Sequence, residues 1–494
     1  MYAMLDTVTL SDVARLLGKE GPFDDSVLSD AAYDSRQAGP GSLFFCLRGN
    51  RSDGHYFAAD AEAAGARAIV CEHPTGAKVP EIIVEDSRAA MNLVASPFFG
   101  EPSKRLEMFG ITGTNGKTTT CFMVDSVFAA AGRKTGLIGT VHNSIAGETT
   151  PAMRTTPESV DLQRLLRAMV DADATHAAVE VTSIGLEEGR IRGTAFDVAA
   201  FTNLTRDHLE EYHGTMEAYF SAKKKLFTDG YADRALVNID DPYGADLYAQ
   251  TTLSRFSYGV SQPADFTVDD LVQGPHGSSF TARGPGFEAK LSISMPGPFN
   301  VSNALCAAAA AHLMGFDSDA IEQGLMNMTG VPGRFESVDM GQPFAVIVDY
   351  AHTPDSLMNI LAAGRKITSG RLVAVFGCGG DRDRPKRALM GEVAATAADV
   401  VIATSDNPRS EEPESILAQI ESGLERRLPK DGYRLIVDRE EAITDALQNA
   451  QPGDVVVIAG KGHETGQEFA DEYKIDFDDR IVARRVLARL GWGV

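Results

Sequence analysis

Short hydrophobic runs alternate with amphipathic stretches along most of the chain. Four such runs between residues 106 and 240 predict strands: LEMFGIT (106–112), HAAVEV (176–181), DVAAFTNL (197–204) and ALVNID (235–240). The segments between them have helical spacing, so this region predicts a mostly parallel sheet with helices on both faces. Glycine and β-forming residues between about 255 and 296 indicate an antiparallel excursion, and NALCAAAAAHLMG (303–315) predicts a helix in which an alanine run packs closely.

The same alternation marks a smaller unit before this region and another unit after it. The N-terminal runs are SLFFCLRG (42–49), ARAIVCEH (66–73) and EIIVED (81–86). The C-terminal runs are FAVIVDYA (344–351), RLVAVFGCGG (371–380), DVVIATSD (399–406), YRLIVD (433–438) and DVVVIAG (454–460). They predict a second doubly wound sheet, whose ligands would bind at the carboxyl ends of its strands. A new unit starts near EPSKRLEMFGIT, and the Gly/Pro-rich segment GVPGRFE (330–336) marks the second boundary, so we expect domains 1–103, 104–332 and 333–494.

Composition narrows the class of protein. The chain has 494 residues, which suggests about three domains. Its formal charge of −23 argues against nonspecific binding to nucleic acid or an anionic membrane. Five scattered cysteines without a CxxC pair fit a reducing compartment, and neither a secretory signal nor an 18-residue apolar run is present. We therefore expect a cytoplasmic α/β protein.

One glycine-rich turn has the chemistry of a phosphate site. GITGTNGKTT (110–119) follows a predicted strand and precedes a predicted helix. Gly113 and Gly116 permit a tight turn whose N–H groups face phosphate oxygens, Lys117 would meet the β- and γ-phosphates, and the Thr118 hydroxyl would reach Mg²⁺. The common phosphate-loop pattern has glycine where this chain has Ile111, and the alternative interpretation is an ordinary glycine-rich turn.

Taken together, several motifs resemble those of the Mur ligases, the ATP-dependent enzymes that build the peptide of peptidoglycan. They occur in the family's order over nearly the whole chain: GTNGKTT (113–119), EVTS (180–183), TNLTRDHLEEYHG (202–214), AKKKLF (222–227), GPFNVSNA (297–304), GVPGRFE (330–336), DYAHTPDSL (349–357) and GCGGDRDRPKR (377–387). The segment 34–57 resembles the family member that adds the third residue of the peptide. The resemblance implies an α/β fold of three domains: one that binds the UDP-sugar, a central P-loop ATPase sheet, and a Rossmann-like C-terminal domain for the incoming amino acid.

The resemblance also implies a reaction. ATP phosphorylates the free γ-carboxylate of UDP-MurNAc-L-Ala-D-Glu, and the amino group of the incoming amino acid displaces phosphate from the acyl phosphate. The protein mainly has to position and neutralise anions, which fits Mg²⁺ with hard oxygen ligands.

Site residues carry over at the positions that match the family's motifs. For ATP they are Gly113, Thr114, Asn115, Gly116, Lys117, Thr118, Thr119, Asn300, Arg334 and Asp349. For the metal they are Thr118, Glu180, His208 and Lys223, and Lys117, Glu180, His208 and Lys223 form the catalytic set. For the UDP-MurNAc-dipeptide they are Ser35, Arg36, Thr155, Thr156, Thr182, Glu188 and Arg190. For the amino acid they are Arg382, Asp406, Asn407, Pro408, Arg409, Gly460 and Glu464.

Two of these assignments have a direct physical reason. The resemblance implies that Lys223 is carbamylated to N6-carboxylysine, because an ammonium repels Mg²⁺ whereas a carbamate offers two oxygen donors. The DNPR segment (406–409) resembles the signature of enzymes that add meso-diaminopimelate. Arg409 can hold the distal carboxylate of that amino acid, which L-lysine lacks.

Alternatives remain at this point. An Arg at position 409 need not exclude an L-lysine-adding enzyme. A folylpolyglutamate synthetase-like ligase shares the phosphate loop and the carbamylated lysine, although segments 34–57 and 406–409 speak against it. A P-loop nucleotide switch, which joins no substrates covalently, is a further alternative. Such a protein would have switch loops and would lack an amino-acid pocket. Ile184 and Glu188 depart from residues frequent in the family, and we expect a monomer.

Overall fold

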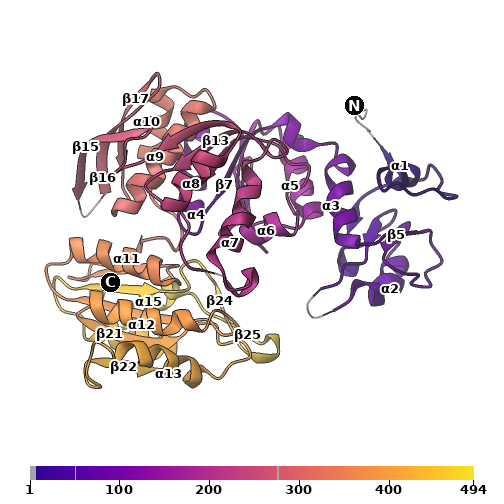
Figure 1. The fold of residues 1–494 in the computed structure, drawn as a ribbon. Coiled ribbons are helices and arrows are strands. Elements are labelled where there is room, and N and C mark those ends of the chain that lie inside the picture. The colour runs from indigo at the N-terminus through magenta and orange to yellow at the C-terminus, as the bar shows by residue number, and fades with distance from the viewer. Residues whose placement is uncertain (1–6, 50–51, 208, 275–276, 494) are drawn as a thin grey trace.

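A computed structural model describes residues 7–49, 52–207, 209–274 and 277–493. Three sheet-centred units follow one another along the chain, and Figure 1 shows the first of them standing apart from the other two. The mixed α/β architecture predicted from the hydrophobic pattern is confirmed. Within the described ranges, every helix is too short or too polar to cross a bilayer.

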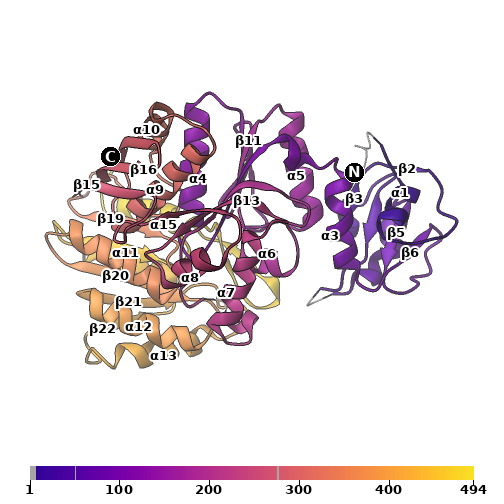
Figure 2. The same cartoon turned by 45° about the horizontal axis from the view of Figure 1, so that its top comes forward.

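The N-terminal unit contains a four-stranded parallel sheet with a small antiparallel hairpin beside it. The sheet order is β3 (Ala31–Ala32), β4 (Leu43–Phe45), β5 (Ala68–Cys71) and β6 (Glu81–Ile83), and the hairpin pairs β1 (Val8–Thr9) with β2 (Val27–Leu28). The helices are α1 (Leu10–Leu16), α2 (Ala58–Ala63) and α3 (Ser87–Phe98). The apolar runs therefore form the strands that the sequence predicts. Helix α3 packs against α5 of the next unit and so attaches this domain (Figure 2).

The central unit is built on an eight-stranded sheet. Its order is β10 (Glu148–Pro151), β9 (His142–Ile145), β8 (Thr135–Ile138), β11 (His176–Glu180), β7 (Glu107–Thr112), β12 (Phe196–Phe201), β13 (Ala232–Asn238) and β14 (Ser254–Tyr258). The strands from β8 to β14 in this order are parallel, whereas β9 and β10 run antiparallel at the edge. The expected antiparallel excursion is the three-stranded sheet of β15 (Thr267–Gly274), β16 (Gly277–Gly284) and β17 (Phe287–Ile293).

Helices cover both faces of the central sheet, as predicted. One hydrophobic core lies under α4 (Lys117–Ala130), α9 (Pro298–Leu313) and α10 (Ser318–Asn327). The other lies under α5 (Ser159–Asp171), α6 (Ser183–Glu187), α7 (Met216–Lys224) and α8 (Pro242–Gln250). The alanine run of α9 is fully buried, which confirms close packing, because small side chains let neighbouring backbones approach.

The C-terminal unit is a six-stranded sheet covered by helices. Its order is β18 (Glu336–Ser337), β19 (Ala345–Asp349), β23 (Val455–Ala459), β20 (Leu372–Cys378), β21 (Val400–Ser405) and β22 (Tyr433–Ile436), and a separate hairpin pairs β24 (Gly466–Glu468) with β25 (Lys474–Asp476). The helices are α11 (Pro354–Ile367), α12 (Pro385–Ala397), α13 (Pro413–Leu424), α14 (Arg439–Gln448) and α15 (Asp479–Arg489). From β19 to β22 the strands are parallel, so their carboxyl ends share one edge.

The central and C-terminal units contact each other beside the phosphate loop. The Asn115 amide donates to the Asp355 carboxylate over 2.9 Å, and Arg206 pairs with Asp383 at 3.2 Å. These contacts bring the carboxyl ends of strands from both sheets to one cleft, which is where ligands bind in doubly wound folds.

Candidate functional site

A cavity of about 430 Å³ lies where the central and C-terminal sheets face each other. Most residues that the sequence singles out line it, although they come from segments hundreds of residues apart. They are Thr114, Asn115, Gly116, Lys117, Thr118, Thr119, Thr155, Thr156, Glu180, Thr182, Arg190, Lys223, Arg334, Asp349, Arg382, Asp406, Asn407, Arg409, Gly460 and Glu464.

The glycine-rich turn joins β7 to α4 at this cavity. Gly113 and Gly116 have φ angles of 147° and 90°, in the region that favours glycine. A Cβ at Gly113 would lie 1.9 Å from Thr202 Oγ1, and one at Gly116 would lie 2.5 Å from Asn303 Oδ1. The loop therefore requires both glycines, and their backbone leads directly into the amino end of a helix, a favourable place for an anion.

Two lysines are buried against this turn. Lys117 Nζ donates to the carbonyls of Gly113 (2.9 Å) and Thr114 (2.8 Å), and Lys223 Nζ donates to Gly113 O at 2.9 Å. Burial lowers the pKa of Lys117. Burial together with the nearby Lys117 charge holds the pKa of Lys223 well below its usual range. The fold therefore increases the fraction of neutral amine at Lys223, which is the nucleophilic form.

Hard oxygen donors gather beside the loop at Glu180, the last residue of β11. Its buried carboxylate accepts the Thr118 hydroxyl at 2.9 Å and the Thr140 N–H at 2.8 Å. These groups meet because β11 pairs in parallel with β7, with Glu180 beside Ile111. A carboxylate and a hydroxyl 2.9 Å apart fit the ligand preference of Mg²⁺. His208 lies outside the described residues.

Thr156 connects the main-chain carbonyl of Glu180 to a guanidinium. Thr156 Oγ1 donates to Glu180 O (2.9 Å) and accepts the Thr182 N–H (2.9 Å), and Arg190 Nη1 donates to Thr156 O at 2.9 Å. Thr155 contacts Thr140 through their hydroxyls. The wall of the cleft thus presents several hydroxyls and a guanidinium, suited to a polar, anionic substrate.

Several predicted residues lie outside the cavity lining. Ser35 and Arg36 lie in the N-terminal unit, where Arg36 is exposed and pairs with Asp34 at 2.6 Å. Asn300 is buried at the start of α9, with its amide donating to Pro296 O. Glu188 pairs with Arg190 at 2.5 Å. Gly113 and Pro408 lie next to lining residues but are not themselves part of the wall.

Residues at the junction of the two units reach across to the phosphate loop. Arg334 Nη2 donates to Thr118 Oγ1 at 3.2 Å, and its guanidinium stacks on Tyr350 with 4.5 Å between its carbon and the ring centre. The buried Nε of Arg334 has no acceptor among the described residues, so the guanidinium keeps a free donor for an anion. Asp349 accepts the N–H groups of Phe335 and Ala351, each at 2.7 Å, and burial raises its pKa.

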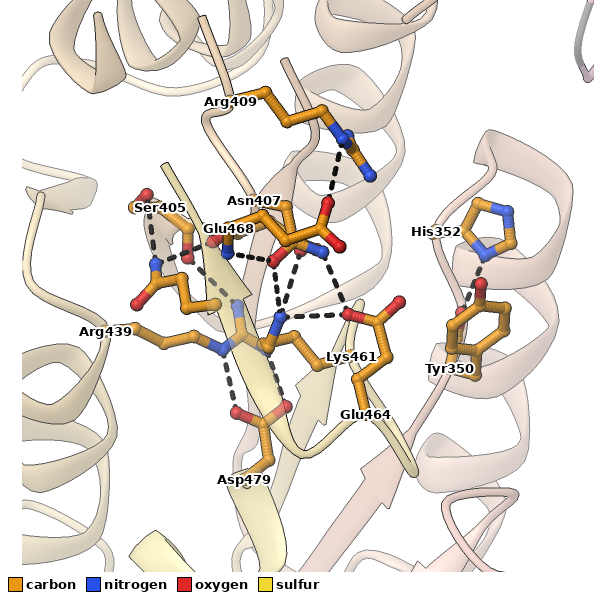
Figure 3. Close-up of polar contacts among 12 residues, drawn as sticks. Tyr350, His352, Ser405, Asn407, Arg409, Arg439, Lys461, Glu464, Glu468 and Asp479 are labelled. Carbon is orange, nitrogen blue, oxygen red and sulfur yellow. Dashed lines mark hydrogen bonds and ion pairs between the residues drawn. The ribbon is translucent and has the colours of Figure 1, made fainter. Parts of the chain in front are cut away.

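The C-terminal wall is formed by loops after β21 and β23 (Figure 3). Arg409 Nε donates to Glu468 Oε2 (3.1 Å) and Nη1 donates to Gly380 O (2.9 Å). Among the described residues Nη2 has no acceptor, so this nitrogen is available to a ligand. Arg382 also lines the cavity, and its Nη1 donates to Asp381 O at 3.1 Å. Gly460 has a φ of 122°, and a Cβ there would lie 2.5 Å from Asp406 Oδ2. This wall therefore combines guanidinium and carboxylate groups.

The sequence did not single out some residues that shape the cleft. Thr140 contacts the Glu180 carboxylate, and its position just after β8 at the carboxyl edge of the sheet is the signal that could have identified it. Tyr350 follows β19 and Lys461 follows β23 in the same way, whereas the contact of Glu468 with Arg409 is one that no local pattern indicates.

Comparison with known proteins gives a consistent result. Three family models match successive parts of the chain: "Mur ligase family, catalytic domain" at residues 31–99, "Mur ligase middle domain" at 111–311, and "Mur ligase, glutamate ligase domain" at 333–462. A protein of Geobacillus kaustophilus named UDP-N-acetylmuramoyl-L-alanyl-D-glutamate--2,6-diaminopimelate ligase is 47% identical over 465 residues, which cover 93% of this chain and 94% of that protein.

Two solved structures have similar folds. A structure of a UDP-N-acetylmuramoyl-L-alanyl-D-glutamate--2,6-diaminopimelate ligase is 33% identical, with a TM-score of 0.67, and the match covers 98% of this chain and 99% of that chain. The MurF ligase from Thermotoga maritima, solved in complex with ADP, is 19% identical with a TM-score of 0.65, and the match covers 93% of this chain and 96% of that chain. The second likeness bears on the fold alone.

Proposed function

Because this chain belongs to the Mur ligase family, we propose that it is an ATP-dependent, ADP-forming ligase of peptidoglycan precursor synthesis. It adds meso-2,6-diaminopimelate to the D-Glu γ-carboxylate of UDP-MurNAc-L-Ala-D-Glu, in agreement with the names of its relatives. The observation that carries this function is a single cavity lined by the phosphate loop, by Glu180 and by the DNPR loop (406–409). One cleft can therefore hold a nucleotide, an acid and an amine together, which is what ligation requires.

The nucleotide half of the reaction belongs to the central domain. Backbone N–H groups of the turn and the amino end of α4 cradle phosphate oxygens, and Lys117 balances their charge. Arg334 offers its free Nε donor from the opposite domain, so closure of the cleft completes the phosphate site. We assign Asn300 and Asp349 to the adenine and ribose end.

A magnesium ion bound here would neutralise the phosphate oxygens during transfer of the phosphoryl group. Thr118 and Glu180 are the described residues that would hold it, because they are hard oxygen donors 2.9 Å apart. We retain His208 as a further ligand on the basis of the motif.

Lys223 becomes a donor of the same kind after carbamylation. Its neutral amine attacks the carbon of CO₂, an N–C bond forms, one C=O bond becomes C–O⁻, and the nitrogen releases a proton to solvent. Supporting this proposal, the fold buries Lys223 and lowers its pKa, which increases the fraction of reactive amine.

The acid substrate approaches from the N-terminal domain. We assign Ser35 and Arg36 to the UDP-sugar, and Thr155, Thr156, Thr182, Glu188 and Arg190 to the muramyl dipeptide. The hydroxyls and the guanidinium of Arg190 on the cleft wall favour this orientation, which directs the γ-carboxylate toward the phosphate loop.

The amine substrate binds on the C-terminal wall. Arg409 lines the cavity and has Nη2 available for a carboxylate, and Arg382 adds a second guanidinium. Asp406, Asn407, Gly460 and Glu464 face the amino group of the same distal end, while Pro408 shapes the turn. L-Lysine has no distal carboxylate, so it offers these guanidinium groups no acceptor.

We further propose the domain limits 1–103, 104–332 and 333–494 and a monomeric enzyme.

The decisive assay combines purified protein, ATP, Mg²⁺ and UDP-MurNAc-L-Ala-D-Glu with either meso-diaminopimelate or L-lysine, and product mass is the readout. We expect the diaminopimelate adduct with stoichiometric ADP. Hydrolysis of ATP that does not depend on the muramyl substrate would instead support a nucleotide switch, and turnover of a pterin substrate would support the folylpolyglutamate alternative.

A further inference from the structure

A fully buried lysine lies directly behind the C-terminal wall of the cleft. Lys461 follows β23, and its side chain has 0% exposure. Its Nζ donates to Asn407 Oδ1 at 2.8 Å and to Glu464 Oε2 at 2.9 Å (Figure 3). The same Nζ lies 3.7 Å from Asp406 Oδ1. One ammonium thus contacts three polar side chains.

The partners of Lys461 reach the cavity, but the lysine itself does not. Asp406, Asn407 and Glu464 all line the cavity, whereas Lys461 does not. The ammonium therefore has no path to a bound substrate, and any effect on substrate recognition must act through the three side chains it contacts.

The ammonium determines which way the Asn407 amide faces. Asn407 Oδ1 accepts from Lys461 Nζ and from the Glu468 N–H at 3.0 Å, so the amide oxygen must face these donors. The Asn407 Nδ2 then points to Glu464 Oε2, to which it donates over 2.9 Å. Lys461 and Asn407 together fix one oxygen of the Glu464 carboxylate and leave the other available.

The ammonium also balances charge. Asp406 and Glu464 are two carboxylates in one half-buried corner, and their repulsion is strong where water is excluded. Burial opposes ionisation of Asp406, but Lys461 and Arg439 outweigh it and lower the pKa of Asp406. Asp406, Glu464 and Lys461 together carry one net negative charge, which suits one substrate ammonium.

A second buried cation, Arg439, already links the ends of strands β21 and β23, so Lys461 is not the link between them. Arg439 joins these ends by donating to Ser405 O (3.3 Å) and Ala459 O (2.9 Å). Its guanidinium is paired with Asp479 at 2.7 Å (Figure 3). In contrast, the contacts of the Lys461 ammonium are with the side chains of residues that line the cavity.

We propose that Lys461 is a positioning residue for the incoming amino acid: it holds Asp406, Asn407 and Glu464 in place and, together with them, forms a subsite of one net negative charge for the distal ammonium of a diamino dicarboxylic acid, beside Arg409. This inference rests on the proposed function, because it names how that same site is organised.

The test compares Lys461→Met with Arg371→Met in the full-length enzyme. Arg371 is a matched control because it pairs with buried Asp454 at 2.7 Å at the opposite end of β23, away from the cavity. For Lys461→Met we expect the KM for meso-diaminopimelate to rise at least about tenfold, the loss typical of a hydrogen bond to a charged group. The KM values for ATP and for the muramyl substrate should change less than about twofold, and Arg371→Met should change none of the three.

Each outcome decides the question. If Lys461→Met raises all three KM values alike, or none, the positioning role is wrong. Lys461→Gln keeps a donor without the charge and serves if the methionine variant does not fold; circular dichroism and thermal melting report folding. If neither variant folds, the lysine acts in stability and the proposal is overturned. A wild-type enzyme that forms no adduct would refute the proposed function itself, which is a separate result.

Discussion

Replacing Arg409 by alanine tests the recognition of the distal carboxylate directly. In the structure two of its nitrogen atoms already have protein partners, Glu468 Oε2 for Nε and Gly380 O for Nη1. Among the described residues Nη2 has no hydrogen-bond acceptor, and Arg409 lines the cavity. At least one charge-assisted hydrogen bond to the substrate is therefore lost in Arg409→Ala. Such a bond contributes about 1.5–3 kcal/mol, so kcat/KM for meso-diaminopimelate should fall by about 10- to 150-fold.

The same change should have little effect on stability. The Arg409 and Glu468 side chains are 22% and 46% exposed, and ion pairs of this kind contribute about 0–1 kcal/mol. The backbone at Arg409 has a φ of 53°, and alanine carries a Cβ as arginine does, so the strain stays the same. We therefore expect a melting temperature within a few degrees of the wild type and a separate, large effect on one substrate.

The assay varies meso-diaminopimelate at saturating ATP and muramyl dipeptide, then varies ATP in turn, and measures adduct formation by mass. Arg427→Ala is the matched control, because Arg427 pairs with Glu392 at 2.8 Å on the surface far from the cavity lining. The preference for diaminopimelate over L-lysine should also shrink in Arg409→Ala. Equal increases in the KM for ATP and for diaminopimelate, or an unchanged preference, would refute the reasoning.

Other changes probe the phosphate half of the site. Lys223→Ala should abolish adduct formation and recover part of it when short carboxylic acids are added, since they replace the carbamate oxygens; full activity without them would contradict the assignment. Gly113→Ala should prevent ATP binding in calorimetry, because its Cβ would lie 1.9 Å from Thr202 Oγ1; unchanged affinity would show that the loop tolerates the shift. Glu180→Gln should raise the Mg²⁺ concentration needed for half-maximal rate about tenfold or more while leaving the melting temperature near that of the wild type, and an unchanged requirement would remove Glu180 from the metal site.

The hydrophobic pattern by itself determined the strands and the three-unit organisation of this protein. Runs such as 176–181 and 197–204 are apolar because strands of a parallel sheet are buried on both faces, and that property is local enough to read from spacing. The glycine-rich turn at 113–119 could also be predicted from the sequence, because its functional groups lie in consecutive residues. Family motifs then added the assignments that spacing alone leaves open.

Only the tertiary structure decided which side chains meet. Glu180 reaches Thr118 and Thr140 because β11 lies between β7 and β8 in parallel register, an order that no single segment encodes. Arg334 reaches the phosphate loop because two domains fold against each other, and Lys461 contacts Asn407 across 54 residues of sequence. Hydrophobic periodicity fixes the face that a residue presents. The partners on that face depend on strand order and domain packing, which are set by the whole chain at once.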